Sequence, residues 1–215
     1  MKKCNTNKKV LWIEVKKVGI FKYGQTEIDY LSKKDKKLKL LIDRIGMIKC
    51  EVISDIFAAL VSSIVGQQIS NKAAETVWSR LCNLLCEITP RAIANKSIEE
   101  IQKCGMTMRK AGYIKAVAEA NIDYNVLHNL TDDEIIKKLT AISGVGVWTA
   151  EMLLIFSLQR QNVLSFSDLA IRRGLMNLYG LDELTKEQFN KYKKQYSPYG
   201  TVASLYLWEL SKVES

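Results

Sequence analysis

The sequence predicts an all-α protein, and three observations in its 215 residues support this fold class. Only two prolines occur, Pro90 and Pro198, so little of the chain is barred from helices. Few stretches show the alternation of polar and apolar residues that is typical of strands. Apolar residues instead recur in runs at helical spacing, and Ser, Thr or Asp often precedes these runs as an N-cap.

The first part of the chain is predicted to hold one ambiguous segment and two helices. Residues 1–30 have no clear period, and VLWIEV within them suits either a short strand or a packed loop. A lysine-rich helix is expected over about 33–45, ending at Gly46. A buried helix follows, with Ser54 as its N-cap and Gly66 at its end.

The central stretch is predicted to hold a series of helices. Ser70 is expected to cap the first, whose predicted apolar stripe is Ala73, Ala74, Val77, Leu81 and Leu84. Three further N-caps follow, at Ser97, Thr107 and Thr131. The last of these forms a capping box with Glu134, three residues on.

The C-terminal part of the chain is predicted to hold three helices. Asp168 precedes the first of them, and Gly180 ends it. Thr185 and Gln188 form a capping box that opens the second. Pro198 is expected in the first turn of the last helix, because an N–H at this position has no partner within the helix and proline has none to leave unpaired.

The formal net charge is +9, and its excess lies in the first quarter of the chain. Residues 1–50 contain 14 Lys and Arg against 5 Asp and Glu, whereas the remaining residues contain 18 of each. A basic balance favours an anionic partner such as nucleic acid or a membrane surface, and the alternative is a solvated lysine-rich face. The charge alone does not mark any later segment as a binding site.

The cysteines and the apolar runs indicate the compartment. The spacing of Cys4, Cys50, Cys82, Cys86 and Cys104 fits no metal framework, so we expect buried thiols in a reducing cytosol. The sequence shows no signal peptide and no apolar run long enough for a bilayer. We therefore expect a cytoplasmic protein without membrane contact, associated with the nucleoid if its source is bacterial.

A tight glycine turn, Gly144-Val145-Gly146, lies between two predicted helices in LTAISGVGVWTAEMLL. Such a turn leaves backbone N–H groups at the start of the second helix, where they and the helix dipole attract an anion, typically phosphate. Glycine permits close approach because it has no Cβ. The alternative is that the glycines serve packing alone.

Three stretches in order resemble the helix-hairpin-helix (HhH-GPD) superfamily of base-excision DNA glycosylases. ISGVGVWTAEMLL with Asp168 some twenty residues later resembles the superfamily's hairpin and catalytic acid. DIFAALVSSIVGQQISNKAAETVWSRL resembles the early helix pair with the loop that probes the duplex. YSPYGTVASLYLWEL resembles the C-terminal helix of the DNA-3-methyladenine glycosylase II, or alkylation-repair, branch. The resemblance covers roughly residues 30–212.

The resemblance implies a two-lobe fold with the active site in the cleft between the lobes. We expect an N-terminal segment, 1–49, that packs with C-terminal helices, 166–215, and a central helical lobe, 50–165. The implied function is that of a monofunctional DNA glycosylase, which hydrolyses the N-glycosidic bond of damaged purines, alkylated ones like 3-methyladenine, in duplex DNA. The alternatives are a glycosylase for mismatched or oxidised bases and a non-catalytic DNA-binding module.

Asp168 is the implied catalytic residue. Departure of a base leaves positive charge on the sugar, and a fixed carboxylate beside C1′ stabilises that charge and orients the attacking water. The first turn of a helix favours the ionised form of the acid. The alternative is plain N-capping, and the two roles are compatible.

Further site residues follow from the resemblance. Trp148 and Tyr199 match aromatic positions of the base pocket, where an electron-poor alkylated purine would stack, although each could be a core aromatic. Trp78 and Trp208 are interpreted as core residues. In GQQIS, Gln68 is the best candidate for the side chain that fills the gap left by an extruded base.

Gln67 and Ile69 flank that candidate in the probe loop, which could instead be only a polar connection. Phosphate contacts are expected from the N–H groups of the 144–146 turn. Arg172 and Arg173 follow Asp168 by one turn, and either one of them reaches DNA or both are solvent-exposed.

The resemblance also indicates which cofactors to expect. Strand-nicking relatives carry a lysine at the position of Trp148, and no lysine lies between Leu139 and Leu184. The last cysteine is Cys104, so the C-terminal iron–sulfur cluster of some relatives is not expected. No cofactor is required. A monovalent cation, Na⁺ or K⁺, is expected when DNA is bound, on the carbonyls of Thr140, Ile142 and Val145.

Two positions depart from the family pattern. Ser143 replaces the proline usual before the first hairpin glycine, and Phe166-Ser167 replaces the Pro or Val often found before the acid. These differences bear on loop rigidity and on the choice of lesion. We expect a monomer whose partner is duplex DNA that contains damaged bases.

Overall fold

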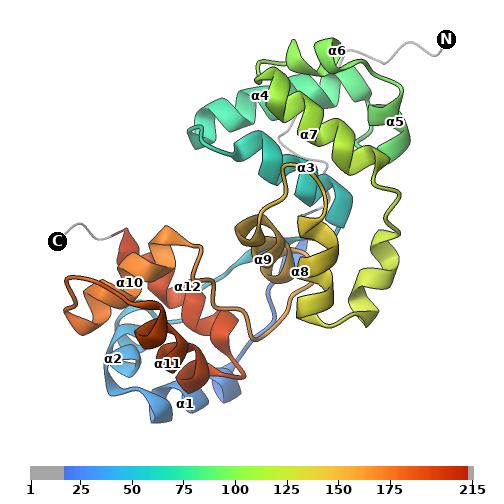
Figure 1. Cartoon of the computed structure of the whole chain (residues 1–215). Coiled ribbons are helices and arrows are strands. Elements are labelled where there is room, and N and C mark those ends of the chain that lie inside the picture. Colours follow the sequence, from blue (N-terminus) through green and yellow to red (C-terminus); the bar gives the residue numbers. More distant parts are fainter. Residues whose placement is uncertain (1–16, 213–215) are drawn as a thin grey trace. The chain divides into compact units, whose positions relative to one another are not determined.

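The computed structural model describes residues 17–212, except for the side chains of residues 17, 18 and 71. Over this range the regular structure is helical, apart from a two-stranded sheet of β1 (Lys17–Ile20) and β2 (Glu51–Ile53) (Figure 1). The all-α prediction is confirmed. Trp12 and the stretch VLWIEV lie outside the described residues.

Contacts within the chain divide the described residues into two compact units. Unit 1 contains residues 17–18 and 53–153, and unit 2 contains residues 19–52 and 154–212. The chain therefore passes from unit 1 back to unit 2 inside helix α9 (Val147–Phe156), after Leu153. The resemblance implies a boundary further along, at residue 165.

Unit 1 consists of helices, and several of them pack against α7. α7 packs against α3, α5 and α6, and it buries Ala111, Ile114 and Val117 along one face. In chain order the helices of unit 1 are α3 (Ile56–Gly66), α4 (Asn71–Leu85), α5 (Pro90–Ala94), α6 (Ile98–Gln102), α7 (Met108–Glu119), the 3₁₀ helix η1 (Tyr124–Asn129), α8 (Asp132–Thr140) and most of α9.

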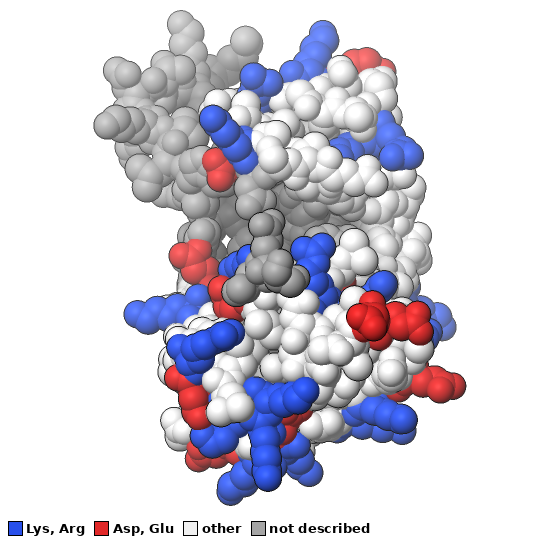
Figure 2. All heavy atoms as spheres, turned by 90° about the vertical axis from the view of Figure 1, so that its left-hand side faces the viewer, with Lys and Arg blue, Asp and Glu red and all other residues white. Residues whose placement is uncertain are grey.

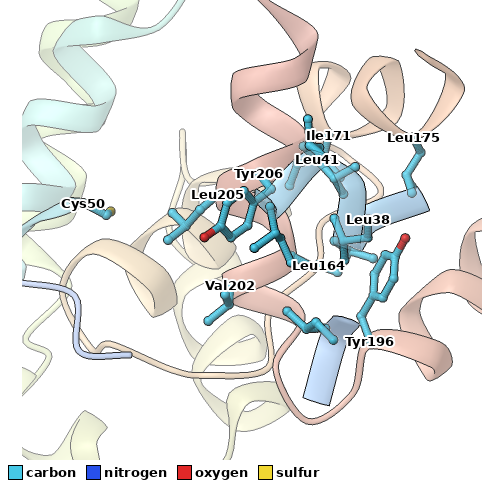
Figure 3. Packing of buried hydrophobic residues seen from close by; sticks show 14 of the residues in the cluster. Leu38, Leu41, Cys50, Leu164, Ile171, Leu175, Tyr196, Val202, Leu205 and Tyr206 are labelled. Atoms are coloured by element: carbon cyan, nitrogen blue, oxygen red, sulfur yellow. The ribbon is translucent and has the colours of Figure 1, made fainter. Parts of the chain in front are cut away.

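Unit 2 packs two early helices against three late ones. α2 contacts α10 and α12, while α1 contacts α11 and α12. Leu38 and Leu41 of α2 point into an apolar core that they share with Ile171 of α10 and Tyr206 of α12 (Figure 3). The helices of unit 2 are α1 (Gln25–Lys34), α2 (Lys36–Ile45), α10 (Leu169–Tyr179), α11 (Lys186–Tyr196) and α12 (Gly200–Ser211).

A buried carboxylate, that of Asp35, joins the helices of unit 2. Asp35 is only 6% exposed, and one of its oxygens accepts from the Leu38 N–H at 2.9 Å, which caps α2. The other oxygen accepts from Gln195 Nε2 at 2.9 Å, from the Tyr196 hydroxyl at 3.1 Å and from the Tyr179 hydroxyl. Four donors therefore satisfy a charge that is costly to bury alone.

Three local predictions are wrong. Asp55 rather than Ser54 is the N-cap of α3, and its carboxylate accepts from the Ala58 N–H at 2.9 Å. The lysine-rich helix ends at Gly46 as predicted but begins at Lys36 rather than at about residue 33, because Asp35 adopts an extended backbone and turns its side chain inward. Pro198 lies two residues before α12 rather than in its first turn.

The remaining cap predictions are confirmed. The side chains of Ser70, Ser97, Thr107, Thr131 and Thr185 each accept the N–H three residues on. The buried face of α4 differs in part from the predicted stripe: it comprises Val77, Trp78, Leu81 and Leu85, whereas Ala73 is exposed. Trp78 is thus a core residue, as expected. Trp208 is partly buried and stacks on Phe156, with ring centroids 5.6 Å apart.

Helices α1 and α2 place exposed lysines on the surface of unit 2. Figure 2 shows lysines and arginines with acids among them over the lower part of this view. The ammonium of Lys34 lies 5.4 Å from the centroid of the Tyr30 ring, and that of Lys37 lies 5.4 Å from that of Tyr179. Among the described residues, none of the helices combines the length and apolarity that a bilayer span requires.

Candidate functional site

The glycine turn connects α8 to α9 in unit 1, and the backbone requires its first glycine. Gly144 has φ +89°, a conformation that favours glycine. A Cβ at this position would lie 2.1 Å from the ring of Tyr113, which packs against the turn. Val145 is buried, and its N–H donates to the Ile142 carbonyl at 3.1 Å. The turn is therefore fixed both by its own hydrogen bond and by α7.

The second glycine of the turn lies in open surroundings. No atom of the described residues lies within 4 Å of a Cβ built at Gly146, and its φ is not in the left-handed region. The Ala150 N–H donates to the Gly146 carbonyl at 3.1 Å, so α9 begins here. Val147 and Trp148 in its first turn are 46% and 40% exposed. An anion can thus approach the N-terminus of α9 closely, as the sequence predicts.

The probe loop lies beside this turn, within the same unit. Gln67 is the C-cap of α3, and its side-chain amide donates to the Gly144 carbonyl at 3.2 Å. Gln68 follows with φ +57° and is exposed, and Ile69 is 39% exposed. The structure therefore joins Gln67 to the hairpin and leaves Gln68 and Ile69 accessible for contact with a ligand.

Lys110 of α7 is a residue of this region that sequence reasoning missed. Its ammonium donates to the Val65 carbonyl at 2.9 Å and to the Gln67 carbonyl. Desolvation lowers the pKa of Lys110 below its usual range. The loop, the turn and α7 together surround a hollow of about 370 Å³ that is also lined by Thr107 and Arg109. Lysines are common on this chain, so no sequence signal distinguishes Lys110.

The predicted catalytic acid lies in unit 2 at the start of α10. Asp168 is 6% exposed, and its Oδ1 accepts from the Ile171 N–H at 2.9 Å. Its carbonyl accepts from the Arg172 N–H at 3.1 Å, which closes the first helical turn. The predicted N-cap role of Asp168 is confirmed. The same position directs the positive end of the α10 dipole toward the carboxylate.

Tyr199 and Arg172 also belong to unit 2. Tyr199 immediately precedes α12 and packs edge-on against Tyr30, with ring centroids 5.2 Å apart. Arg172 is partly buried, and its guanidinium lies 5.2 Å from the centroid of the Phe166 ring. Its Nε is buried and has no hydrogen-bond partner among the described residues. Arg173 is exposed. The alternative that both arginines are solvent-exposed is therefore wrong for Arg172.

The predicted site residues are divided between the two units. Trp148, the probe loop and the glycine turn belong to unit 1, whereas Asp168 and Tyr199 belong to unit 2. Trp148 is too exposed to be a core residue of unit 1. The cleft between lobes that the resemblance implies stays a prediction.

The family of the chain follows from its match to a family model. The model of the HhH-GPD superfamily of base excision DNA repair proteins matches residues 61–198, a range that includes the probe loop, the glycine turn and Asp168. The chain belongs to this superfamily.

Its relatives include several 3-methyladenine glycosylases. DNA-3-methyladenine glycosylase 1 of Schizosaccharomyces pombe is 35% identical over 166 residues, which is 73% of each chain. The structure of that organism's Mag1 with abasic DNA has a TM-score of 0.78 at 32% identity, covering 88% of this chain and 98% of the other. A DNA-3-methyladenine glycosidase from Bacillus halodurans has a TM-score of 0.80 at 36% identity, covering 89% and 92%.

Proposed function

We propose that this protein is a monofunctional DNA glycosylase of base excision repair, which hydrolyses the N-glycosidic bond of alkylated purines in duplex DNA. The observation that carries the proposal is the buried carboxylate of Asp168 at the N-terminus of α10, in a chain of the HhH-GPD superfamily. The names of its relatives, which are 3-methyladenine glycosylases, support the choice of alkylated bases.

The proposed reaction is hydrolysis at C1′ of the sugar. The bond between C1′ and the base nitrogen breaks, and its electron pair leaves with the base. An alkylated purine that is cationic becomes neutral in this step, so it departs more readily than an ordinary base. The ionised carboxylate of Asp168 stabilises the positive charge that develops on the sugar. Water then adds to C1′ and loses a proton, which leaves an abasic sugar.

Most contacts with the DNA are assigned to groups of unit 1, and Tyr199 of unit 2 is the exception. The N–H groups at the start of α9 bind a backbone phosphate near Gly146, where no Cβ intervenes. Gln68 enters the duplex in place of the extruded nucleotide, which costs a few kcal/mol to unstack. Trp148 and Tyr199 supply aromatic faces for the base. The protein acts as a monomer, and a cytoplasmic location stays a prediction.

The monovalent cation expected at the hairpin fits the local chemistry. Carbonyl oxygens are the ligands that hard cations prefer, and the Ile142 carbonyl accepts one hydrogen bond and so retains a second lone pair. Thr140 and Val145 would supply the other carbonyls. When bound, the cation would add positive charge beside the phosphate-binding turn. The reaction at C1′ does not depend on it.

Substitution of Asp168 tests the mechanism. Asn is as good an N-cap as Asp, so Asp168→Asn removes the charge while it retains the cap of α10. We expect release of an alkylated purine from a duplex to fall at least about 100-fold, with affinity for the duplex unchanged or raised. Asp55→Asn, at the N-cap of α3, is the matched control and should retain activity.

The same assay distinguishes the alternatives. Duplexes that each carry one alkylated, mismatched or oxidised base at a defined position show which lesion is released. The product strand should break only after alkali, because Trp148 occupies the position of the strand-nicking lysine. If Asp168→Asn releases base as fast as the unchanged protein, the proposed mechanism is wrong. If the unchanged protein releases none of the bases, the non-catalytic DNA-binding alternative stands.

A further inference from the structure

Two lysines of α7 each cap the C-terminal end of another helix in unit 1. The ammonium of Lys110 donates to the carbonyls of Val65 and Gln67, at the end of α3. The ammonium of Lys115 donates to Ala94 at 2.8 Å and to Lys96 at 3.0 Å, at the end of α5. In both cases a positive charge satisfies carbonyls at the negative end of a helix dipole. The two lysines therefore cap different helices in the same way, although Lys115 also pairs with Glu119 at 3.4 Å.

The target of Lys110 is the probe loop. Its two acceptor carbonyls, those of Val65 and Gln67, lie on either side of Gly66. The second immediately precedes Gln68, the exposed residue with φ +57°. A non-glycine residue in this conformation is held there only when its surroundings fix it. The side chain of Gln67 provides a second attachment through its 3.2 Å hydrogen bond to the Gly144 carbonyl. The loop is thus joined to α7 and to the phosphate-binding turn.

We propose that Lys110 is the positioning residue of the probe loop: it fixes the end of α3 so that Gln68 is presented to the duplex beside the glycine turn. This inference rests on the proposed glycosylase function. Lys110 does not touch the reacting atoms and acts through the loop. Lys115 has no corresponding role, because the end of α5 contains none of the proposed DNA-contacting residues.

Loss of this positioning should affect only substrates whose base must be extruded from a stack. A rigid loop reduces the conformational freedom that Gln68 must lose when it enters the duplex. In single-stranded DNA the lesion needs no such insertion. The ratio of the base-release rates on duplex and on single-stranded DNA therefore reports on the loop, whereas a general loss of folded protein lowers both rates equally.

The test compares Lys110→Met with Lys115→Met. Methionine retains an unbranched apolar stem and removes the charge and its hydrogen bonds. Single-turnover release of an alkylated purine is measured for each variant on a duplex and on the same strand alone, and urea unfolding is measured alongside. We expect Lys110→Met to lower the duplex rate about 10-fold or more and to leave the single-strand rate within about twofold. Lys115→Met should leave both rates unchanged.

A double variant shows whether Lys110 acts through Gln68. Gln68→Ala should lower the duplex rate alone, and adding Lys110→Met to it should lower that rate little further. Equal duplex-to-single-strand ratios for Lys110→Met and Lys115→Met would overturn the inference, as would fully additive effects with Gln68→Ala. Should Lys110→Met fail to fold, Lys110→Gln replaces it on the same ratio. If the unchanged protein releases no base from either substrate, it is the proposed function that has failed.

Discussion

Gly144 and Gly146 lie two residues apart in one turn, but the structure needs them for different reasons. Gly144 has a left-handed backbone and no room for a Cβ against Tyr113, so its role is conformational. Gly146 has neither constraint, and the space beside it is open to solvent. In this motif of two glycines, Gly144 therefore shapes the turn and Gly146 leaves room for a ligand.

Alanine substitutions should separate these two roles. We expect Gly144→Ala to lower the free energy of unfolding by about 1–3 kcal/mol or more, because a Cβ would overlap the Tyr113 ring. Gly146→Ala should change that free energy by less than about 0.5 kcal/mol but weaken binding to duplex DNA. Urea unfolding and fluorescence anisotropy measure the two quantities. Equal stability losses would contradict the assignment.

At the scale of the helix, close packing depends on one further glycine. α10 and α12 make the most extensive helix contact in unit 2, and Gly174 lies where they cross. A Cβ there would lie 2.3 Å from the carbonyl oxygen of Leu207, which belongs to the backbone and cannot rotate away. Since Asp168 caps α10, this crossing also fixes the helix that carries the proposed catalytic acid.

Gly174→Ala should therefore separate two helices, whereas Gly112→Ala should not. We expect Gly174→Ala to reduce the free energy of unfolding by about 1–3 kcal/mol or more, since α12 must shift. Gly112 lies within α7, and an added Cβ would meet no atom of the structurally described part of the chain within 4 Å, so alanine there should stabilise the protein by about 0.5–1 kcal/mol. Thermal and urea unfolding of both variants would show the opposite signs. A gain in stability with Gly174→Ala would mean that the crossing is loose.

Most caps, which depend on neighbouring residues, could be predicted from the sequence, although the cap of α3 lies at Asp55 rather than Ser54. Features that depend on distant residues could not be predicted. The capping boxes of Thr131 and Thr185 are correct because all of their hydrogen bonds lie within four residues. The break at Asp35 was missed because its tyrosine and glutamine partners come from α10 and α11. Lys110 was missed for the same reason, as its acceptor carbonyls lie more than 40 residues earlier.

Over the whole of unit 2, one buried network joins the early helices to the late ones. The hydroxyls of Tyr179 and Tyr196 are 2.7 Å apart, and both donate to Asp35. Burial, together with the neighbouring phenol and carboxylate, raises the pKa of Tyr196 far above its usual value. Burial and the Asp35 carboxylate do the same for the pKa of Tyr179. Both phenols therefore stay protonated in the folded protein.

Stability should consequently fall in alkali. In the unfolded chain these tyrosines ionise near pH 10, whereas the folded chain retains their protons. The stabilisation is thus complete below about pH 10 and is lost as the pH rises further, by about 1.4 kcal/mol per pH unit for each phenol. Tyr196→Phe should be less stable than the unchanged protein at pH 8 but lose stability less steeply above pH 10. Urea unfolding at several pH values measures both slopes, and parallel curves would contradict this account.

Unit 2 is assembled from two segments that residues 53–153 separate along the chain. During synthesis, α1 and α2 leave the ribosome while α10 and α12 do not yet exist. The roughly 100 intervening residues take about 5–20 s to translate, and throughout that interval Leu31 and Leu38, which are fully buried in the finished protein, lack the late helices that share their core. During synthesis the apolar faces of the earliest helices are thus not yet covered by the late ones, and chaperones can bind them.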